Sequence, residues 1–533
     1  MGIPSFYRRL SVVHKGLITK DRGTKAAALY FDFNCLIYHV ARSKKMPAYS
    51  VITHKEWEAK LLENIQQYIV HVWRQGGEPS EVFLAVDGVV PLAKIKQQRL
   101  RRFKSAWLVE EERQLGIRET HGESWDTNSI TPGTLFMEKL GTSLRSLCKQ
   151  RGKGWSVSDA EEPGEGEQKI MRLLRQRNPQ DYNGSVLVYG LDADLILLTM
   201  LNGVGRGLQN CFLMREDEEF GRKNPAELEA FSYFNMNKLP PSLWKDFNSL
   251  TDEQKSARIR NYVAGMSLLG NDFLPHSLSM KVREDGHEQL AKDLLELEAK
   301  GLSFLVQDSS GQYVIQKDVL LSLVSKWATD EDATILDSIR KKLVMRHTVN
   351  QVDAEQVLQN RPLEWSVEAE AVQWEKGEGG KSRLSFRGGW RSVYHEKWNK
   401  QTPMETLCQQ YLYGLQWIIH YYTGQQEVPN TWMYPTSLPP FWSDLAQFLK
   451  SGQSWTGLAY QKIPIQPQQQ LAMVLPLSSW YLIRDKSLRG LPQTQCQYWP
   501  SKFGFFSVGK RFLWECEPEI PHLPLSVINR EMR

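Results

Sequence analysis

The sequence lacks the features that would assign it to several common classes of protein. No apolar run is long enough to cross a bilayer, and no signal-peptide pattern precedes the first predicted strand. The six cysteines include no CxxC pair, which argues against a zinc module or a disulfide framework and favours a reducing compartment. The opening Met-Gly suggests myristoylation, but Phe6 stands where that signal needs Ser or Thr.

The charge balance also lacks a strong bias. The 533 residues carry a formal net charge of only +5, with 41% hydrophobic and 24% charged residues, which is typical of a soluble globular protein. Such a small excess identifies no partner, although a local cluster of one sign still can. The length allows more than one hydrophobic core.

The first 280 or so residues have an α/β pattern. Short apolar runs at 26–31, 82–86 and 186–189 each lead to an aspartate, and segments such as 60–73 and 168–175 place apolar residues at helical spacing. Strands that alternate with helices predict a mostly parallel central sheet flanked by helices.

The second half of the chain differs in composition. Eleven of the eighteen tryptophans lie after residue 350, and residues 375–389 are typical of a loop or a weakly ordered connection. We find no internal repeat. Because the aromatic side chains need an apolar surface to cover, we expect this half to pack against the first.

Acidic residues follow the predicted strands at the edge where open α/β sheets bind ligands. Further acids stand in two glycine-containing turns, PGEGEQK and GNDFLPH. The seven expected to converge are Asp32, Asp87, Glu165, Glu167, Asp192, Asp194 and Asp272. Any one of them alone could simply cap a helix, but seven at such positions are better explained by a common site.

Seven carboxylates in one crevice would repel each other unless cations neutralised them. Oxygen ligands without clustered His or Cys favour Mg²⁺, with Mn²⁺ as a possibility, over zinc. Two ions roughly 4 Å apart can generate a hydroxide and stabilise both oxygens of a phosphoryl displacement. The acids therefore predict a two-metal phosphodiesterase site.

A basic helix is predicted over residues 91–113, directly after Asp87. Lys94, Gln98, Arg101 and Arg102 fall on one face of this helix, and guanidinium forks suit terminal phosphate oxygens. By itself the face could be merely solvated, or a targeting signal. Its position beside the acids favours phosphate binding.

Together these motifs resemble the Xrn-type 5′→3′ exoribonuclease family, within the flap-endonuclease and PIN-like fold group. The motifs occur in the same order as in the family: MGIPSFYRRL, YFDFN, AVDGVVPLAKIKQQRLRRFK, PGEGEQKIM, YGLDADLILL and LLGNDFLPH, and later LYGLQWIIHYYTG and TWMYP. The resemblance spans nearly the whole chain and is weakest between about 285 and 400.

The resemblance implies specific roles. The seven acids match the family's catalytic metal-binding residues, and the four residues of the basic helix match its pocket for a 5′-monophosphate. Trp432 matches an aromatic that stacks on a base near the 5′ end. The family's other stacking residue is a histidine, for which this chain has Tyr38, and Cys35 replaces the usual glycine. A tyrosine ring can still stack on a base.

The expected protein is therefore a processive exoribonuclease that degrades 5′-monophosphorylated single-stranded RNA to mononucleotides. We expect a catalytic domain over 1–285, a connecting helical region over 286–400, and a second family segment over 401–533 that completes the pocket. A short member without long C-terminal extensions is expected, as a monomer that binds no membrane. We expect it in the cytoplasm, with the nucleus as the alternative. Two rivals remain: a structure-selective 5′ flap or DNA nuclease, and a non-catalytic relative that binds RNA 5′ ends.

Overall fold

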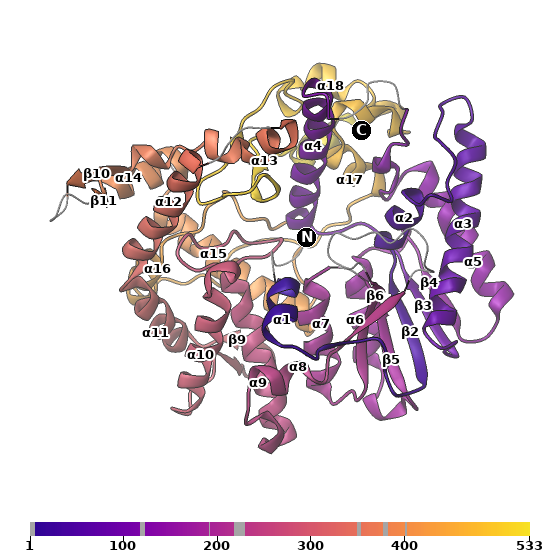
Figure 1. The fold of residues 1–533 in the computed structure, drawn as a ribbon, viewed down its shortest axis with the longest axis horizontal. Helices are drawn as coiled ribbons and strands as arrows, with labels where there is room; N and C mark the ends of the chain where they lie inside the picture. The colour runs from indigo at the N-terminus through magenta and orange to yellow at the C-terminus, as the bar shows by residue number, and fades with distance from the viewer. Residues whose placement is uncertain are drawn as a thin grey trace.

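A seven-stranded sheet forms the centre of the N-terminal half (Figure 1). The computed structural model describes residues 6–117, 123–190, 192–217, 230–348, 353–376, 382–399 and 402–532. The strand order is β1-β7-β6-β5-β2-β3-β4, in which β4, β3, β2, β5 and β6 are parallel and β7 and β1 add antiparallel pairs at one edge. The predicted α/β class with a mostly parallel sheet is confirmed. The strands are β1 (Ile18–Thr19), β2 (Ala26–Asp32), β3 (Glu81–Ala85), β4 (Trp155–Ser158), β5 (Ser185–Tyr189), β6 (Cys211–Glu216) and β7 (Phe231–Asn235).

The central strands are apolar on both faces because helices cover both sides of the sheet. In β2, Ala28 and Tyr30 face the core formed with α6 and α7, whereas Leu29 and Phe31 face the core formed with α3 and α5. Figure 1 shows these helix pairs on opposite sides of the strands. The helices of this half are α1 (Phe6–Val13), α2 (Asn34–Ala41), α3 (His54–Gln75), α4 (Leu92–Gln114), α5 (Leu135–Arg151), α6 (Gly166–Gln176), α7 (Asp194–Asn202), α8 (Leu239–Leu243) and α9 (Asp252–Met266).

The rest of the chain is mainly helical, with three small antiparallel hairpins. Its helices are α10 (Gly286–Glu298), α11 (Lys317–Ala328), α12 (Glu331–Thr348), α13 (Ala354–Glu364), α14 (Trp390–Ser392), α15 (Met404–Thr423), α16 (Trp442–Lys450), α17 (Pro467–Val474), α18 (Leu491–Thr494) and α19 (Leu525–Glu531). Its strands are β8 (Leu305–Gln307), β9 (Tyr313–Ile315), β10 (Val372–Lys376), β11 (Ser382–Phe386), β12 (Phe505–Phe506) and β13 (Glu517–Pro518).

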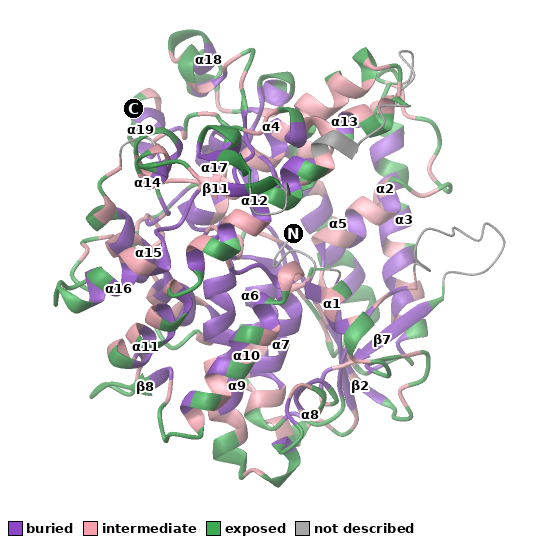
Figure 2. Ribbon diagram, turned by 60° about the vertical axis from the view of Figure 1, so that its left-hand side comes forward, coloured by how far each residue is buried: buried purple, intermediate pink, exposed green. Residues whose placement is uncertain are grey.

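Helix α4 forms one of the contacts between the two halves, beside a larger core that α7 and α9 share with α15. Leu92, Ile95 and Phe103 on α4 share an apolar core with α17, α19 and the tryptophans at 480 and 499. The buried Arg99 side chain donates hydrogen bonds to the carbonyl oxygens of Pro521, Met473 and Tyr498, all in the C-terminal segment. Figure 2 shows α4 and α17 close together, with α4 largely buried where the two meet. The second half therefore packs against the first, as expected.

One sequence prediction about local structure is wrong in part. Residues 375–389 were expected to form a loop, but β10 and β11 pair in register from Val372 with Phe386 to Lys376 with Ser382. Alternating residues of this hairpin pack on α12 and on Trp390, which explains why it is ordered. The intervening residues 377–381 lie outside the described part of the chain, as do residues 1–5 of the opening motif.

Candidate active site

The acids of the N-terminal half meet at the carboxyl edge of the parallel strands. Asp32 ends β2, Asp87 follows β3, Asp192 follows β5, and Glu165 is the residue before α6. A hollow of about 170 Å³ is lined by six of the seven predicted acids, namely Asp32, Asp87, Glu165, Glu167, Asp192 and Asp272. Asp194, the first residue of α7, is buried beside it.

A glycine allows α6 to approach the strands this closely. A Cβ on Gly166 would lie 2.5 Å from the carbonyl oxygen of Ala85 and 2.9 Å from Oδ1 of Asp32, so no side chain fits there. The Gly166 N–H donates to Oδ1 of Asp87 at 2.7 Å. The helix start thus fixes one acid while its own flanking acids, Glu165 and Glu167, reach the hollow.

Lys94 lies between two of the acids. Its Nζ is 2.5 Å from Oε2 of Glu165 and 2.7 Å from Oδ2 of Asp272. Burial opposes the charge of this lysine, but Asp272 and Glu165 raise its pKa well above the usual value. Burial also opposes ionisation of Asp272, yet the Lys94 ammonium keeps the pKa of this carboxyl below its usual value. Lys94 therefore neutralises part of the acid cluster.

Lys94 does not compensate three of the other carboxylates, Asp194, Asp32 and Glu167, to the same extent. Burial, followed by repulsion from Asp192 and Asp272, raises the pKa of Asp194 to about 7. Burial and neighbouring acids also raise the pKa of Asp32 and of Glu167 well above the usual carboxyl range. Such mutual destabilisation of buried charges is expected where a cation belongs.

The donor set fits divalent metal ions. Oδ1 of Asp194 is buried and accepts no hydrogen bond among the described residues, so it is free to bind a cation. Carboxylate oxygens are the ligands that Mg²⁺ and Mn²⁺ prefer. Within the described ranges, however, no three His, Cys, Asp or Glu side chains are already close enough to form a metal-binding cluster. Carboxylates that repel each other are expected to remain apart until cations draw them together.

The predicted basic face of α4 borders the same hollow. Gln98, Arg101 and Arg102 all line it, together with Lys94. Arg102 donates through Nη1 to Oδ1 of Asn128 at 2.7 Å, and its buried Nε has no hydrogen-bond acceptor in the described part of the chain. Burial lowers the pKa of Arg102 to about 10. A buried guanidinium with a free donor is suited to an anionic ligand.

The two predicted base-stacking residues lie in different environments. Tyr38 lines the hollow. Trp432 is 0% exposed, and its indole N–H donates to Gln410 while its ring packs against Trp417. The Trp432 ring is therefore covered in this structure, and its base-stacking role remains a prediction. Gly414 makes room for the Trp432 ring, because a Cβ at position 414 would lie 2.5 Å from it.

Two residues of the site were not singled out from the sequence. Asn34 exchanges hydrogen bonds with Asp87, donating from Nδ2 to Oδ2 at 2.9 Å. The Tyr421 hydroxyl donates to Oε1 of Glu165 at 2.7 Å. Asn34 is the last residue of the motif YFDFN, so the sequence did contain a signal for its role. Tyr421 lies 256 positions from its partner, and nothing in the local pattern connects the two.

Fold and site together define a PIN-like α/β protein whose carboxylates gather at one edge of a parallel sheet beside a cationic helix. Comparison with known families gives two matches: XRN 5'-3' exonuclease N-terminus over residues 1–217, and Xrn1 helical domain over residues 341–532. The chain therefore belongs to the Xrn-type 5′→3′ exoribonuclease family. The resemblance inferred from the motifs is confirmed.

Individual relatives support this assignment over different lengths. The chain is 33% identical to 5'-3' exoribonuclease 1 of Saccharomyces cerevisiae over 52% of its length, and 34% identical to 5'-3' exoribonuclease 2 of Eremothecium gossypii over 54%. It is 26% identical to human 5'-3' exoribonuclease 1 over 98% of its length. These matches cover 19%, 37% and 33% of the three relatives, respectively. The chain thus spans about a fifth to just over a third of the curated relatives that it matches.

The helices give one further finding. Among those that the structure describes, none has both the length and the apolar character needed to cross a bilayer.

Proposed function

We propose that the chain is a 5′→3′ exoribonuclease that removes mononucleotides from 5′-monophosphorylated single-stranded RNA. One observation carries this proposal: the acids and the cationic face of α4 line the same hollow. A substrate phosphate held by α4 would place the next phosphodiester bond beside the carboxylates. The relatives' names, which specify 5'-3' exoribonucleases, agree with this direction of cleavage.

The acid cluster is the proposed site of two divalent metal ions, Mg²⁺ or Mn²⁺. The residues that would hold them are Asp32, Asp87, Glu165, Glu167, Asp192, Asp194 and Asp272. When bound, the ions would supply a nucleophile from water and stabilise charge on the phosphoryl oxygens. The Asn34 side chain fixes the Asp87 carboxylate, and Tyr421 fixes that of Glu165, so both are oriented before a ligand arrives.

The proposed 5′-phosphate grip consists of Gln98, Arg101 and Arg102, with Lys94 at its boundary with the acids. A hollow of about 170 Å³ is small beside the roughly 300–1,000 Å³ of most ligand pockets, which agrees with a grip on a single phosphate group. Gripping the terminal phosphate would fix the distance to the first phosphodiester bond. A cap or a triphosphate would exceed the space.

Base stacking is assigned to Tyr38 alone. The ring lines the hollow, and stacking on an aromatic ring needs only an accessible face. Trp432 has a supporting role instead: it packs on Trp417, whose ring stacks on that of Tyr421 at 4.9 Å between centroids. Trp432 is thereby connected through two rings to the Glu165 carboxylate.

The test is a comparison of RNA ends on the purified chain with Mg²⁺. Matched RNAs with a 5′-monophosphate, triphosphate, cap or hydroxyl, each labelled at the 3′ end, are incubated in parallel with 5′ flap DNA. We expect rapid loss of the monophosphate RNA with mononucleotide products and slow turnover of the others. Preferential cleavage of the flap DNA would support the structure-selective nuclease instead. Tight binding of monophosphate RNA with no cleavage would support a non-catalytic relative.

A further inference from the structure

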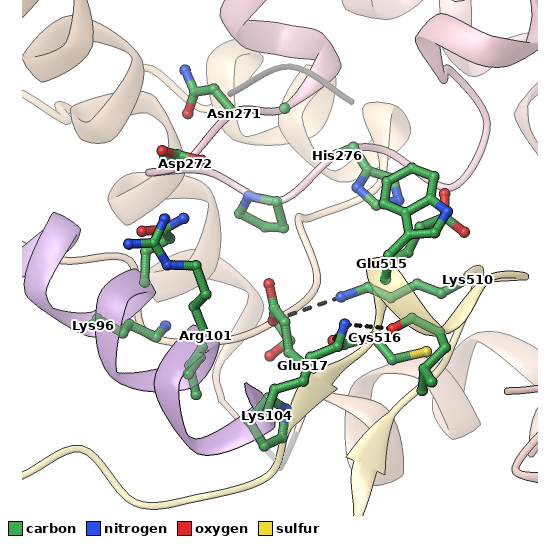
Figure 3. A pocket seen from close by; sticks show the side chains of 18 of the residues that line it. Lys96, Arg101, Lys104, Asn271, Asp272, His276, Lys510, Glu515, Cys516 and Glu517 are labelled. Carbon is green, nitrogen blue, oxygen red and sulfur yellow. Dashed lines mark hydrogen bonds and ion pairs between the residues drawn. The ribbon is translucent and has the colours of Figure 1, made fainter. Parts of the chain in front are cut away.

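A second, larger cavity lies on the neighbouring face of α4. It has a volume of about 620 Å³ and is enclosed by α4, the loop at residues 269–276, and the C-terminal segment 510–518 (Figure 3). This volume is well within the roughly 300–1,000 Å³ typical of small-molecule sites. The predicted site residues do not account for it.

Cationic side chains converge on this cavity from three separate segments. Those that line it are Lys96, Arg101, Lys104, Lys281, Arg283 and Lys510. Figure 3 shows Lys96, Arg101 and Lys104 on one helix, with Lys510 approaching from the C-terminal segment. The cations outnumber the acids of the lining, which are Glu112, Asp272, Glu515 and Glu517. Glu515 pairs with Arg283 and Glu517 with Lys510, whereas Asp272 binds Lys94 outside the cavity lining.

Two of the lysines, the partly buried Lys104 and the buried Lys281, form no ion pair with a carboxylate in the part of the chain that the structure describes. Lys104 donates to the carbonyl oxygens of Leu513 and Cys516, and Lys281 donates to the Ser338 hydroxyl and the Gly509 carbonyl. An ammonium has three N–H donors, so each lysine has one more than these partners use. The remaining donor of each lysine is available to an anionic ligand.

The electrostatics of the cavity reflect this excess. Burial lowers the pKa of Lys104 to about 8, and burial together with Arg283 lowers that of Lys281 to about 7. Burial and the nearby Lys281 and Lys510 hold the pKa of His276 well below its usual value. Arg283 lies 2.7 Å from a Glu515 oxygen, yet none of its three buried guanidinium nitrogens has a well-oriented hydrogen-bond acceptor among the described residues. An anion would relieve all of these groups.

An aromatic ring is available beside the cations. Trp514 lines the cavity, is 47% exposed, and lies parallel to Phe512 with 6.1 Å between ring centroids. An accessible aromatic ring can stack on a nucleobase, and a ring beside a phosphate-binding group suits a nucleotide. The apolar residues Leu100 and Leu108 contribute to the same lining.

The cavity and the catalytic hollow have a common wall. Arg101 and Asp272 line both. The two spaces are therefore neighbours, and the side chains between them include Arg101 and Asp272. Arg101 faces both spaces and could contact a phosphate on either side.

We propose that this cavity is a second binding site, for a nucleoside 5′-monophosphate, with the phosphate on Lys104 and Lys281 and the base on Trp514. It would receive the product of the neighbouring hollow and free that hollow for the next phosphate. The proposal rests on the proposed function only for the source of the ligand.

The binding test uses the full chain with EDTA and does not depend on catalysis. Equilibrium dialysis measures adenosine 5′-monophosphate, inorganic phosphate and adenosine, in an Arg102→Gln background that weakens phosphate binding in the catalytic hollow. Trp514→Ala is expected to weaken nucleotide binding by about tenfold, the size of one stacking contact, without changing phosphate binding. Lys104→Gln is expected to weaken both.

Matched controls are available on other surfaces. Trp374 is 51% exposed on the β10–β11 hairpin, and Lys60 is exposed on α3, so Trp374→Ala and Lys60→Gln should leave binding unchanged. Because Trp514 is half exposed, its variant should fold, and circular dichroism checks this for every variant. Unchanged nucleotide binding in folded Trp514→Ala would overturn the proposal, as would adenosine binding as tightly as the monophosphate. Displacement of the nucleotide by 5′-hydroxyl RNA would also overturn it, and would assign the cavity to the RNA strand.

The two proposals can fail independently. Absence of RNA cleavage with intact nucleotide binding would refute the proposed function and leave the cavity assignment standing. Cleavage that adenosine 5′-monophosphate inhibits only competitively against RNA, with the same inhibition constant in Trp514→Ala, would refute the cavity assignment alone.

Discussion

The two hollows beside α4 carry opposite charges. In the acid hollow, burial and repulsion between neighbouring carboxylates raise the pKa of Asp194 to about 7. In the larger cavity, burial and the nearby Arg283 lower the pKa of Lys281 to about 7. Both hollows are poorly satisfied by their own residues, and each would be stabilised by a ligand of the opposite sign. Such local cost is expected at functional sites rather than in a structural core.

The largest effect should come from removing one acid. Asp194→Asn keeps the shape of the side chain but deletes a proposed metal ligand, so RNA cleavage should fall by on the order of 10³-fold or more. Binding of monophosphate RNA should persist, because α4 is untouched. Glu167→Ala should behave in the same way, whereas Asp252→Asn on the surface of α9 should be silent. Near-normal turnover in Asp194→Asn would show that the acids are not the reacting centre.

A large effect is also expected when the acid hollow loses a cation from its rim. Arg102→Gln should lower kcat/KM for 5′-monophosphate RNA by roughly 30- to 150-fold, equivalent to about 2–3 kcal/mol for a lost charged hydrogen bond. The ratio of monophosphate to hydroxyl RNA turnover is the measurement. Arg113→Gln, at the exposed end of the same helix, is the control. If both variants preserved the preference, α4 would not be the phosphate grip.

Aromatic substitutions should separate the lining of the hollow from its support. Tyr38→Ala should raise KM for RNA by about tenfold, because the stacking contact is lost. Tyr38→His keeps an aromatic ring, so its KM should stay close to that of the unchanged chain. Trp432→Leu should instead lower the melting temperature, because it leaves a void in the core. Thermal melts and steady-state kinetics on the same samples give both values. A selective KM effect of Trp432→Leu, with an unchanged melting temperature, would restore its base-stacking role.

A smaller effect is expected from Tyr421→Phe. This change removes the hydrogen bond to Glu165 and keeps the ring, so cleavage should fall only about fivefold, equivalent to about 1 kcal/mol. Tyr481→Phe, whose exposed hydroxyl meets Asp126, is the matched control. A raised Mg²⁺ requirement with little change in RNA affinity would identify a positioning role. Loss of RNA affinity alone would argue against it.

The smallest effect, on the order of a few °C, is a pH dependence of thermal stability without metal or phosphate. The raised pKa of Asp194 means that its folded form binds the extra proton, so stability should fall as pH rises from about 4 to 7. The lowered pKa of Lys281 means the reverse, so stability should rise between about 7 and 10.5. Differential scanning calorimetry should show a minimum near neutral pH. Asp194→Asn should flatten the acid side and Lys281→Met the alkaline side; an unchanged profile in both would contradict the comparison.

The sequence predicted the parts of the site that follow from local rules. Strand β2 and the acid at its end, the helical face of Lys94 and Gln98, and the glycine turn before α6 all depend on periodicity or on nearby residues. The seven roles assigned to the acids remain predictions. The burial of Trp432 could not be predicted, because an exposed and a buried tryptophan look the same in a motif.

The cavity could not be predicted at all. Its lining comes from α4, from the turn after α9, and from residues more than two hundred positions further on. Only the fold determines that Lys281 lies near the carbonyl of Gly509. Likewise, no pattern in the sequence indicates that Tyr421 would reach Glu165.

The buried Arg99 has one more consequence. Arg99 lies on the same helix as Gln98 and Arg102, and its guanidinium donates to peptide oxygens of the last sixty or so residues and lies over the Trp499 ring. Without the C-terminal segment, the Arg99 charge would have no hydrogen-bond acceptors and the apolar face of α4 would be exposed to water. The alignment of α4 with the acids would then be lost. The two family segments therefore depend on each other, and we expect neither fragment of a chain cut between them to be active.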